Sequence, residues 1–263
     1  MIVHRWSGKY IPRLDTKMCF LRCLGNLKNL TLLALEYSHI ADGTGDALTA
    51  LTPIIKKTHF QLQLICREDH TPGLTDAALG GGGYSIPDTT WRAVSSTAPN
   101  LYLLISFYRI RDYDNVRRFL SPSIPLREVH LTYGIDLKTK QRQDSDLSCF
   151  IRHVTHYYGH ILVTLSIHQW RFATFPLRRI LQLIPRLTRL QYVGKLEDDI
   201  DVKRILQIVA CGACEKLKEL NIQIQTDVNT RAYWSQVVEK LIEEYSQIMC
   251  LYNINLCLSV YKS

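Results

Sequence analysis

The chain has 263 residues, of which 46% are hydrophobic and 21% charged, and its formal net charge is +8. This composition excludes a disordered chain. No run reaches the roughly 18 consecutive apolar residues of a membrane span, and the first ten residues lack the apolar core of a signal peptide. We therefore expect a cytoplasmic protein, with the nucleus as the second location. The basic residues are scattered in short pairs such as Arg117-Arg118, a distribution that does not favour a nucleic-acid partner.

Helical and strand-like segments alternate along the chain. Asp15 is a favourable N-cap for a short helix that Gly25 would end, and apolar residues alternate with glutamines over 59–66, which predicts a strand. A polar, glycine-rich stretch at 67–87 is interpreted as a flexible insertion. In chain order the expected helices cover 15–24, 46–57, 88–98, 112–120, 147–158, 176–184, 201–211 and 230–247, and the expected strand phrases begin at 30, 59, 101, 126, 162, 187, 217 and 251.

One phrase, L-x-x-L-x-L, recurs where the strands begin. Its cleanest copy is Cys214-Glu-Lys-Leu217-Lys-Glu-Leu220-Asn-Ile222. Copies recur at intervals of about 25 to 42 residues, which is the leucine-rich-repeat range stretched by insertions. The first leucines are Leu30, Leu101, Leu126, Leu162, Leu187, Leu217 and Leu251, with a weaker copy near His59.

The repeats predict an α/β leucine-rich-repeat solenoid, or horseshoe, with parallel strands on the concave face and helices on the convex face. Residues 1–24 would form an N-terminal cap, and residues 25–263 a domain of about eight repeats. The alternative is an ordinary α/β open sheet, which also alternates helices and strands but need not repeat the phrase.

Eight cysteines lie among apolar neighbours and are expected to be reduced and mostly buried. Cys211 and Cys214 form a C-x-x-C pair. A structural zinc site needs a second pair at matching spacing, and a redox pair is expected at the start of a helix rather than at its end. We therefore interpret both residues as buried structural cysteines.

Other candidate sites also lack a complete motif. His153, His156 and His160 share one helix face but have no H-E-x-x-H, so they are interpreted as a helix edge that faces solvent or a partner. Gly80 to Gly83 are not followed by the Gly-Lys-Ser/Thr of a phosphate loop. The sequence predicts no metal, no cofactor and no catalytic set, and hence a protein that is not an enzyme.

The x positions of the phrase would line the strand face and bind a protein partner. In the third strand, Leu103, Ile105 and Phe107 could be either core residues or an exposed apolar patch. Trp170 and Arg171, at a strand exit, are residue types common in interface hot spots. The predicted partner-binding residues are Glu128, His130, Thr164, Ser166, His168, Trp170, Arg171, Arg189, Gln191, Glu219, Asn221 and Gln223, followed by Asn253 and Asn255 in the last repeat.

The C-x-x-L-x-x-L-x-L phrase with helix-length spacers resembles the cysteine-containing repeats of F-box proteins with leucine-rich repeats. Residues 86–131, with a Trp-containing helix followed by A-P-N-L and S-I-P-L strand starts, are most similar to divergent F-box-only members. The resemblance implies the substrate-recognition region of a receptor of a cullin–RING (SCF-type) ubiquitin ligase, acting in ubiquitin-dependent protein degradation.

The F-box itself, a helical segment of the L-P-x-E-x-L type, is absent from residues 1–24. The Skp adaptor and a cullin are therefore expected partners only if an F-box lies upstream. Two interpretations stay open: the chain is a fragment or isoform of such a receptor, or it is a leucine-rich-repeat adaptor or regulator with no ubiquitin-ligase role. Both predict a protein–protein interaction scaffold.

Overall fold

A computed structural model describes residues 14–27, 29–67, 85–110, 116–117, 119–133, 147–169, 177–196 and 198–262. The expected insertion at 67–87 and the expected helix at 112–120 lie largely outside these residues. The chain divides into two compact units, of which unit 1 contains the described residues up to Glu128 and unit 2 those from Val129 onward.

Unit 1 is a parallel sheet with short helices. Its strands pair in chain order, β1 with β2 and β2 with β3, and Gln61 of β2 is in register with Leu32 of β1 and Tyr102 of β3. The elements are α1 (Leu14–Gly25), β1 (Leu32–Glu36), the 3-10 helix η1 (Tyr37–His39), α2 (Asp46–Ala50), α3 (Thr52–Ile55), β2 (Gln61–Arg67), α4 (Asp88–Thr97) and β3 (Tyr102–Ile110). β4 (Leu126–Tyr133) begins in unit 1 and ends in unit 2.

The structure shows which residues of the third strand belong to the core. Leu103, Ile105 and Phe107 are at most 1% exposed, so they belong to the core rather than to an exposed apolar patch. Leu104 and Ser106, which alternate with them, are also buried. β3 therefore buries Leu104 and Ser106 on the face where β2 carries partly exposed glutamines, and among its described side chains only the tyrosines, Tyr102 and Tyr108, are partly exposed there.

Side-chain hydrogen bonds connect α4 to the turn before β4. The Asp88 carboxylate accepts hydrogen bonds from the Ser123 backbone N–H and hydroxyl, both at 2.9 Å. Desolvation alone would raise the pKa of Asp88, but the hydrogen bonds from Ser123 outweigh it and hold this pKa below its usual range. The charged form of Asp88 thus fixes the start of α4 relative to the start of β4.

Unit 2 repeats a strand–helix pair. β5 pairs with β6, β6 with β7 and β7 with β8, all parallel and in chain order. The elements are α6 (Leu147–Tyr158), β5 (Thr164–Gln169), α7 (Leu177–Leu183), β6 (Arg189–Gly194), α8 (Ile200–Ala210), β7 (Glu219–Thr226), α9 (Arg231–Leu251) and β8 (Asn255–Lys262).

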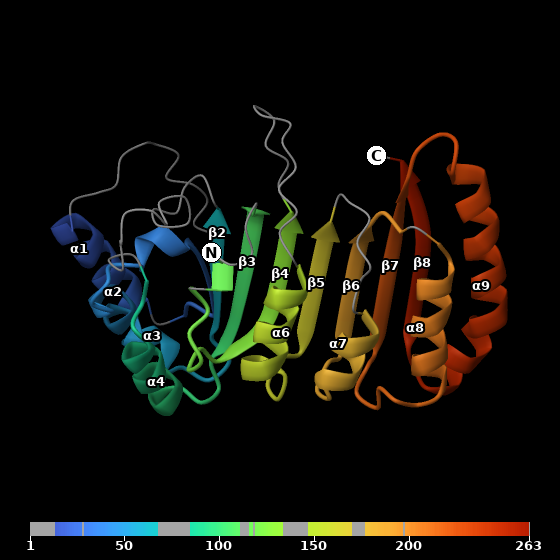
Figure 1. Ribbon diagram of the computed structural model, residues 1–263. Coiled ribbons are helices and arrows are strands. Elements are labelled where there is room, and N and C mark those ends of the chain that lie inside the picture. The colour runs from blue at the N-terminus through green and yellow to red at the C-terminus, as the bar shows by residue number, and fades with distance from the viewer. Residues whose placement is uncertain are drawn as a thin grey trace. The chain divides into compact units, whose positions relative to one another are not determined.

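The helices of unit 2 cover one face of its sheet. Parallel strands joined in chain order by right-handed crossovers place every connecting helix on the same side. In agreement, α6 contacts α7, α7 contacts α8, and α8 contacts α9, and α6, α7 and α8 are drawn in front of the strands in Figure 1. The core lies between these helices and the strand residues that face them.

The two last helices end in the same way. Gly212 follows α8 with φ 73°, and Asn253 follows α9 with φ 56°. In each case the next residue donates its N–H to a carbonyl five residues back, Ala213 to Ile208 and Ile254 to Met249, which is the hydrogen-bond pattern of the Schellman motif.

This ending corrects the sequence prediction for the last repeat. α9 continues through Leu251, which is 85% exposed and so is not the first leucine of a phrase. The buried residue before the strand is Ile254, and the register pairs Leu220 with Leu256. The other predicted first leucines, from Leu30 to Leu217, are all buried.

The α/β class with parallel strands is confirmed. The expected helices at 15–24, 88–98, 147–158, 176–184 and 201–211 correspond to α1, α4, α6, α7 and α8 within two residues at either end. The expected helix at 46–57 is divided into α2 and α3 near Pro53. None of the helices in the described ranges is both long and apolar enough to cross a membrane.

Candidate functional site

The face of the unit 2 sheet opposite the helices carries a ladder of mainly polar side chains, which we call the open face. Parallel register brings one residue of each strand into line, and successive inward and outward residues alternate because of the pleat. The rows are Thr164, Arg189, Glu219 and Asn255; then Ser166, Gln191, Asn221 and Cys257; then His168, Val193, Gln223 and Ser259; and finally Gln225 and Tyr261.

The first row holds a charge pair. Arg189 Nε lies 2.7 Å from Glu219 Oε2, and both side chains are partly exposed. Neighbouring strands place these residues directly opposite each other, where opposite charges attract. The pair leaves this part of the open face without net charge.

The second row contains an unpaired acceptor. The Ser166 hydroxyl donates to Gln191 Oε1 at 3.3 Å. The next residue along the row, Asn221, has a buried Oδ1 with no hydrogen-bond donor in the described part of the chain. Row two therefore contains one amide oxygen, between Gln191 and Cys257, that is buried without a donor in the described part of the chain.

Two ring side chains reach toward each other across the open face. Tyr261 Oη on β8 lies 3.5 Å from His168 Nε2 on β5. These strands are three strand spacings apart, about 14 Å, so both rings must lean inward over β6 and β7. Burial lowers the pKa of His168 and raises the pKa of Tyr261, which keeps both groups neutral near pH 7.

Gln225 lies at the strand exit of the same face. Gln225 is only 3% exposed, and its Oε1 has no hydrogen-bond donor among the described residues. A buried acceptor without a donor costs about 1–3 kcal/mol. Gln225 and Asn221 thus place two unpaired amide oxygens on one strand, four residues apart.

The structure places most of the predicted partner-binding residues on strands. Ser166, His168, Arg189, Gln191, Glu219, Asn221 and Gln223 share the open face and are all at least partly exposed, whereas Thr164 is only 3% exposed. His130 lies on the unit 2 part of β4, and Glu128 lies in unit 1, where it accepts a hydrogen bond from the Tyr102 hydroxyl. Trp170 and Arg171 lie outside the described residues.

Four residues of the open face were missed. Gln225 continues the alternation of β7 past the end of its phrase, and Cys257, Ser259 and Tyr261 were not included because the last repeat was predicted to begin two residues too early. The alternation of Leu256, Leu258 and Val260 would have revealed them. Asn253, which was predicted to face outward, instead occupies the left-handed turn before β8.

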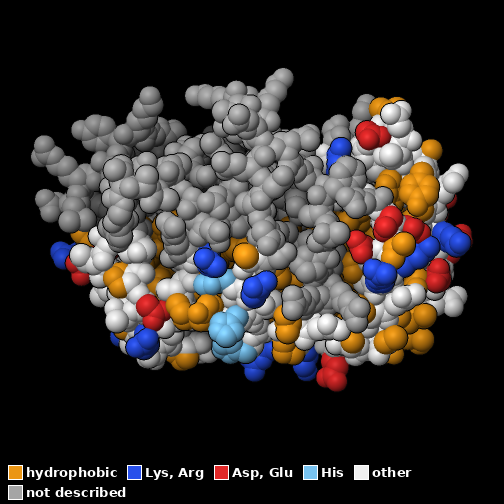
Figure 2. Space-filling view, viewed as in Figure 1, with side chains coloured by type: hydrophobic (Ala, Val, Ile, Leu, Met, Phe, Trp, Pro, Cys, Tyr) orange, Lys and Arg blue, Asp and Glu red, His pale blue; other side chains and the backbone are white. Residues whose placement is uncertain are grey.

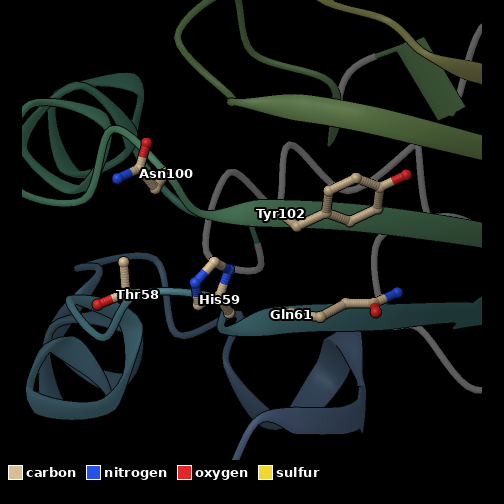
Figure 3. A pocket seen from close by; sticks show the side chains of 5 residues that line it. All are labelled: Thr58, His59, Gln61, Asn100 and Tyr102. Atoms are coloured by element: carbon tan, nitrogen blue, oxygen red, sulfur yellow. The ribbon is translucent and has the colours of Figure 1, made fainter.

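Unit 1 has a separate polar hollow of about 450 Å³. Figure 3 shows Gln61 and Tyr102 on two neighbouring strands and Thr58, His59 and Asn100 in the segments before them. The left-handed backbone of His59, with φ 67°, lies at this turn. The lining groups are amides, a hydroxyl, an imidazole and a phenol, which can form hydrogen bonds with a polar ligand.

The prediction that most cysteines are buried is wrong. Only Cys66 is buried, and burial raises the pKa of its thiol. Cys214 is half-buried, and desolvation raises its pKa to about 11, so its thiol is protonated and unreactive at neutral pH. The exposed cysteines lie on α1, near the ends of α8 and α9, and at one outward position of β8, which the apolar neighbours in the sequence concealed; they are Cys19, Cys23, Cys211, Cys250 and Cys257.

The histidine run is divided by the end of a helix. α6 ends at Tyr158, so His160 lies in the following turn. The rings of His153 and His156 both contact the ring of Tyr157, the first tilted and the second edge-to-face, at centroid distances of 4.7 and 4.6 Å. Within the described ranges, no cluster of three or more His, Cys, Asp or Glu side chains could hold a metal ion.

No protein-family model and no curated protein matches this chain.

Proposed function

We propose that the chain is a leucine-rich-repeat interaction scaffold whose open face in unit 2 binds a segment of another protein. The repeated strand–helix pair, the buried first leucines and the in-order parallel pairing support the repeat assignment. In such proteins the strand face is the usual ligand surface. The chain acts by holding its partner, without a chemical step.

The observation that carries this proposal is the ladder of polar side chains on the open face. Parallel register aligns Ser166, Gln191 and Asn221 in one row and His168 and Gln223 in the next, and all five are partly exposed. A polypeptide laid across these rows could exchange hydrogen bonds with hydroxyl, amide and imidazole groups of several strands at once. Strand faces of repeat proteins commonly bind ligands in this way.

The helix side of unit 2 carries two ion pairs on or beside α8: Lys203 with Asp199, and Arg204 with Asp201 at 4.0 Å. Figure 2 shows acidic and basic side chains intermingled in the region of α8 and α9. Exposed pairs of this kind are ordinary features of a solvated surface. The open face also has one, Arg189 with Glu219, but its other rows carry uncharged polar and apolar side chains, which supports placing the partner there.

The resemblance to F-box receptors extends the proposal to a substrate receptor of a cullin–RING ligase. In that case the open face would hold the protein to be ubiquitinated, and an F-box joined to the repeats would hold the Skp adaptor. The competing proposal is a repeat scaffold or regulator without ligase coupling. The two differ in whether adaptor and cullin accompany the protein.

Affinity purification from cells that express the full-length protein distinguishes them. Three baits are compared by quantitative mass spectrometry: the unaltered protein, Gln191→Ala/Asn221→Ala/Gln223→Ala on the open face, and Gln182→Ala/Arg204→Ala/Glu239→Ala on exposed helix positions. A ligase receptor brings down adaptor and cullin with all three baits but loses its substrate with the open-face variant alone.

A stable partner without adaptor or cullin favours the uncoupled scaffold. Identical partner sets for all three baits would contradict the role of the open face. Each variant is first compared with the unaltered protein by circular dichroism and thermal unfolding, so that a misfolded bait is not mistaken for one that has lost its contact surface.

A further inference from the structure

The polar hollow of unit 1 lies where β2 and β3 begin. Gln61 and Tyr102 are in register, so their side chains lie next to each other on one face of the sheet. Backbone hydrogen bonds fix both strand starts: the Gln61 N–H donates to the Thr31 carbonyl at 2.8 Å, and the Tyr102 N–H donates to the Phe60 carbonyl at 3.2 Å. Two paired strands thus hold these side chains at one side of the hollow, as Figure 3 shows.

His59 lines the hollow from a backbone conformation in which glycine is the usual residue. Its φ is 67°, and two other turns have Gly212 and Asn253 in this conformation. Asn253 precedes β8 by two residues, as His59 precedes β2. Histidine is tolerated there better than most residues but less well than glycine. Residues held in this way cluster at binding sites, so we attribute the choice of histidine to its imidazole.

The side chains around the hollow suit a ligand that carries several hydroxyl groups. The amides of Gln61 and Asn100 each place an acceptor oxygen beside an NH₂ donor. Two neighbouring hydroxyl groups of one ligand also combine an acceptor with a donor, so they match an amide in both senses. The Thr58 hydroxyl and the His59 imidazole add further hydrogen-bonding groups.

Tyr102 contributes an apolar surface to the hollow. Its hydroxyl donates a hydrogen bond to Glu128 on β4, so the phenol proton is used within unit 1 and the side chain offers a ligand mainly its ring. The C–H groups of a sugar ring can pack against such a surface. An aromatic ring beside two amides is therefore complementary to a molecule that has both C–H faces and hydroxyl edges.

The hollow offers no counter-charge to an anion. Among the described residues that line it, none is lysine or arginine, although the whole chain has a net charge of +8. Phosphate and carboxylate ligands are normally held by such cations. The site therefore favours a neutral molecule, and its volume of about 450 Å³ falls in the range of small-molecule sites.

We propose that the hollow of unit 1 binds a neutral sugar ring, either as a free sugar or as the terminal residue of a glycan. Thr58, His59 and Asn100 are exposed, so one side of the bound ring remains in water and the dissociation constant lies in the millimolar range. The site belongs to unit 1 and does not depend on the partner proposed for the open face of unit 2.

The experiment is ligand-observed NMR by saturation transfer on the purified full chain. The probes are glucose, mannose, galactose and N-acetylglucosamine, each as the free sugar and as its methyl glycoside, with adenosine and adenosine monophosphate as competitors. We expect a saturable response from at least one sugar. A methyl glycoside that binds as well as its free sugar assigns the site to a terminal glycan residue, and one that does not bind assigns it to free sugars.

Titration of the isotope-labelled chain locates the sugar by the shifts of backbone amides. We expect these shifts at 58–61 and 100–102. His59→Gly should weaken binding yet melt at the same temperature or higher, because glycine adopts this φ without strain. Asn100→Ala should weaken binding about five- to tenfold through the loss of its amide hydrogen bonds. Asn26→Ala removes an exposed amide that does not line the hollow and is the control.

Absence of a saturable response from every sugar would overturn the proposal, and so would shifts confined to other residues. Preferential binding of adenosine or of adenosine monophosphate would contradict the assignment to sugars. Folded His59→Gly and Asn100→Ala variants that bind as tightly as the unaltered chain would show that the hollow is not the site.

Discussion

His168 shows how the chemistry of a single residue follows from its place on the open face. Its ring leans inward toward Tyr261, and desolvation disfavours the imidazolium. The neutral ring can accept a hydrogen bond from the tyrosine hydroxyl, whereas the charged ring cannot. The contact across β6 and β7 therefore depends on pH.

Stability should fall as the pH is lowered past the ordinary histidine pKa of 6.5. Because the folded pKa is depressed, the unfolded chain binds more protons in that window, so unfolding becomes easier as the pH falls. His168→Gln should flatten the slope of melting temperature against pH between about 7.5 and 5. The exposed His156→Gln on α6 is the control, and an equal slope in the His168→Gln variant would contradict the account.

The buried amide of Gln225 should lower the stability of the free protein. Gln225→Met keeps the side-chain length and removes the unpaired Oε1, so the free energy of unfolding should rise by about 1 kcal/mol. Gln191→Met removes an oxygen that does accept a bond from Ser166 and should give no such gain. Chemical denaturation measures both, and a destabilised Gln225→Met variant would show that Gln225 has a partner in the free protein.

At the scale of elements, neighbouring repeats pack through a close approach of backbone. Gly159 follows α6, and a Cβ built there would lie 2.5 Å from the Thr155 carbonyl oxygen and 2.7 Å from that of Leu183 in α7. Neither is the movable end of a side chain. Only glycine permits this contact between the ends of α6 and α7 without a backbone shift.

Gly159→Ala should therefore destabilise the protein by about 1–3 kcal/mol, because the backbone must move to relieve the overlap. The substitution His160→Ala, at the exposed neighbouring position, is the control and should change stability little. Thermal unfolding of both variants provides the comparison. A Gly159→Ala variant as stable as the unaltered protein would mean that the ends of α6 and α7 are farther apart than described.

The elements were predictable wherever the local pattern was complete. Period-2 alternation predicted β2 and β7, and apolar spacing predicted α6 and α8. The prediction of the last repeat failed because α9 has no strong helix breaker before Asn253, and the left-handed backbone of that residue ends the helix. A phrase that began at Leu251 looked like its predecessors in the sequence, but the helix was still continuing there.

At the scale of the whole molecule, the sequence predicted the α/β class and the parallel strands because both follow from the repeat. It predicted which strand residues alternate outward but not how they meet. The reach of Tyr261 to His168, the burial of Thr164 and Gln225 and the exposure of most cysteines depend on contacts between distant segments. No local period encodes these contacts, so the candidate site was predicted only in part.

The central claim is that a protein partner contacts the open face of unit 2. The most direct measurement is photo-cross-linking in cells, with a photoreactive amino acid placed at Gln223 on the open face or at Gln182 on α7. The account predicts that the Gln223 position yields an adduct with a defined partner and that the Gln182 position does not. Adducts with the same partner from Gln182 alone, or equally from both positions, would contradict it.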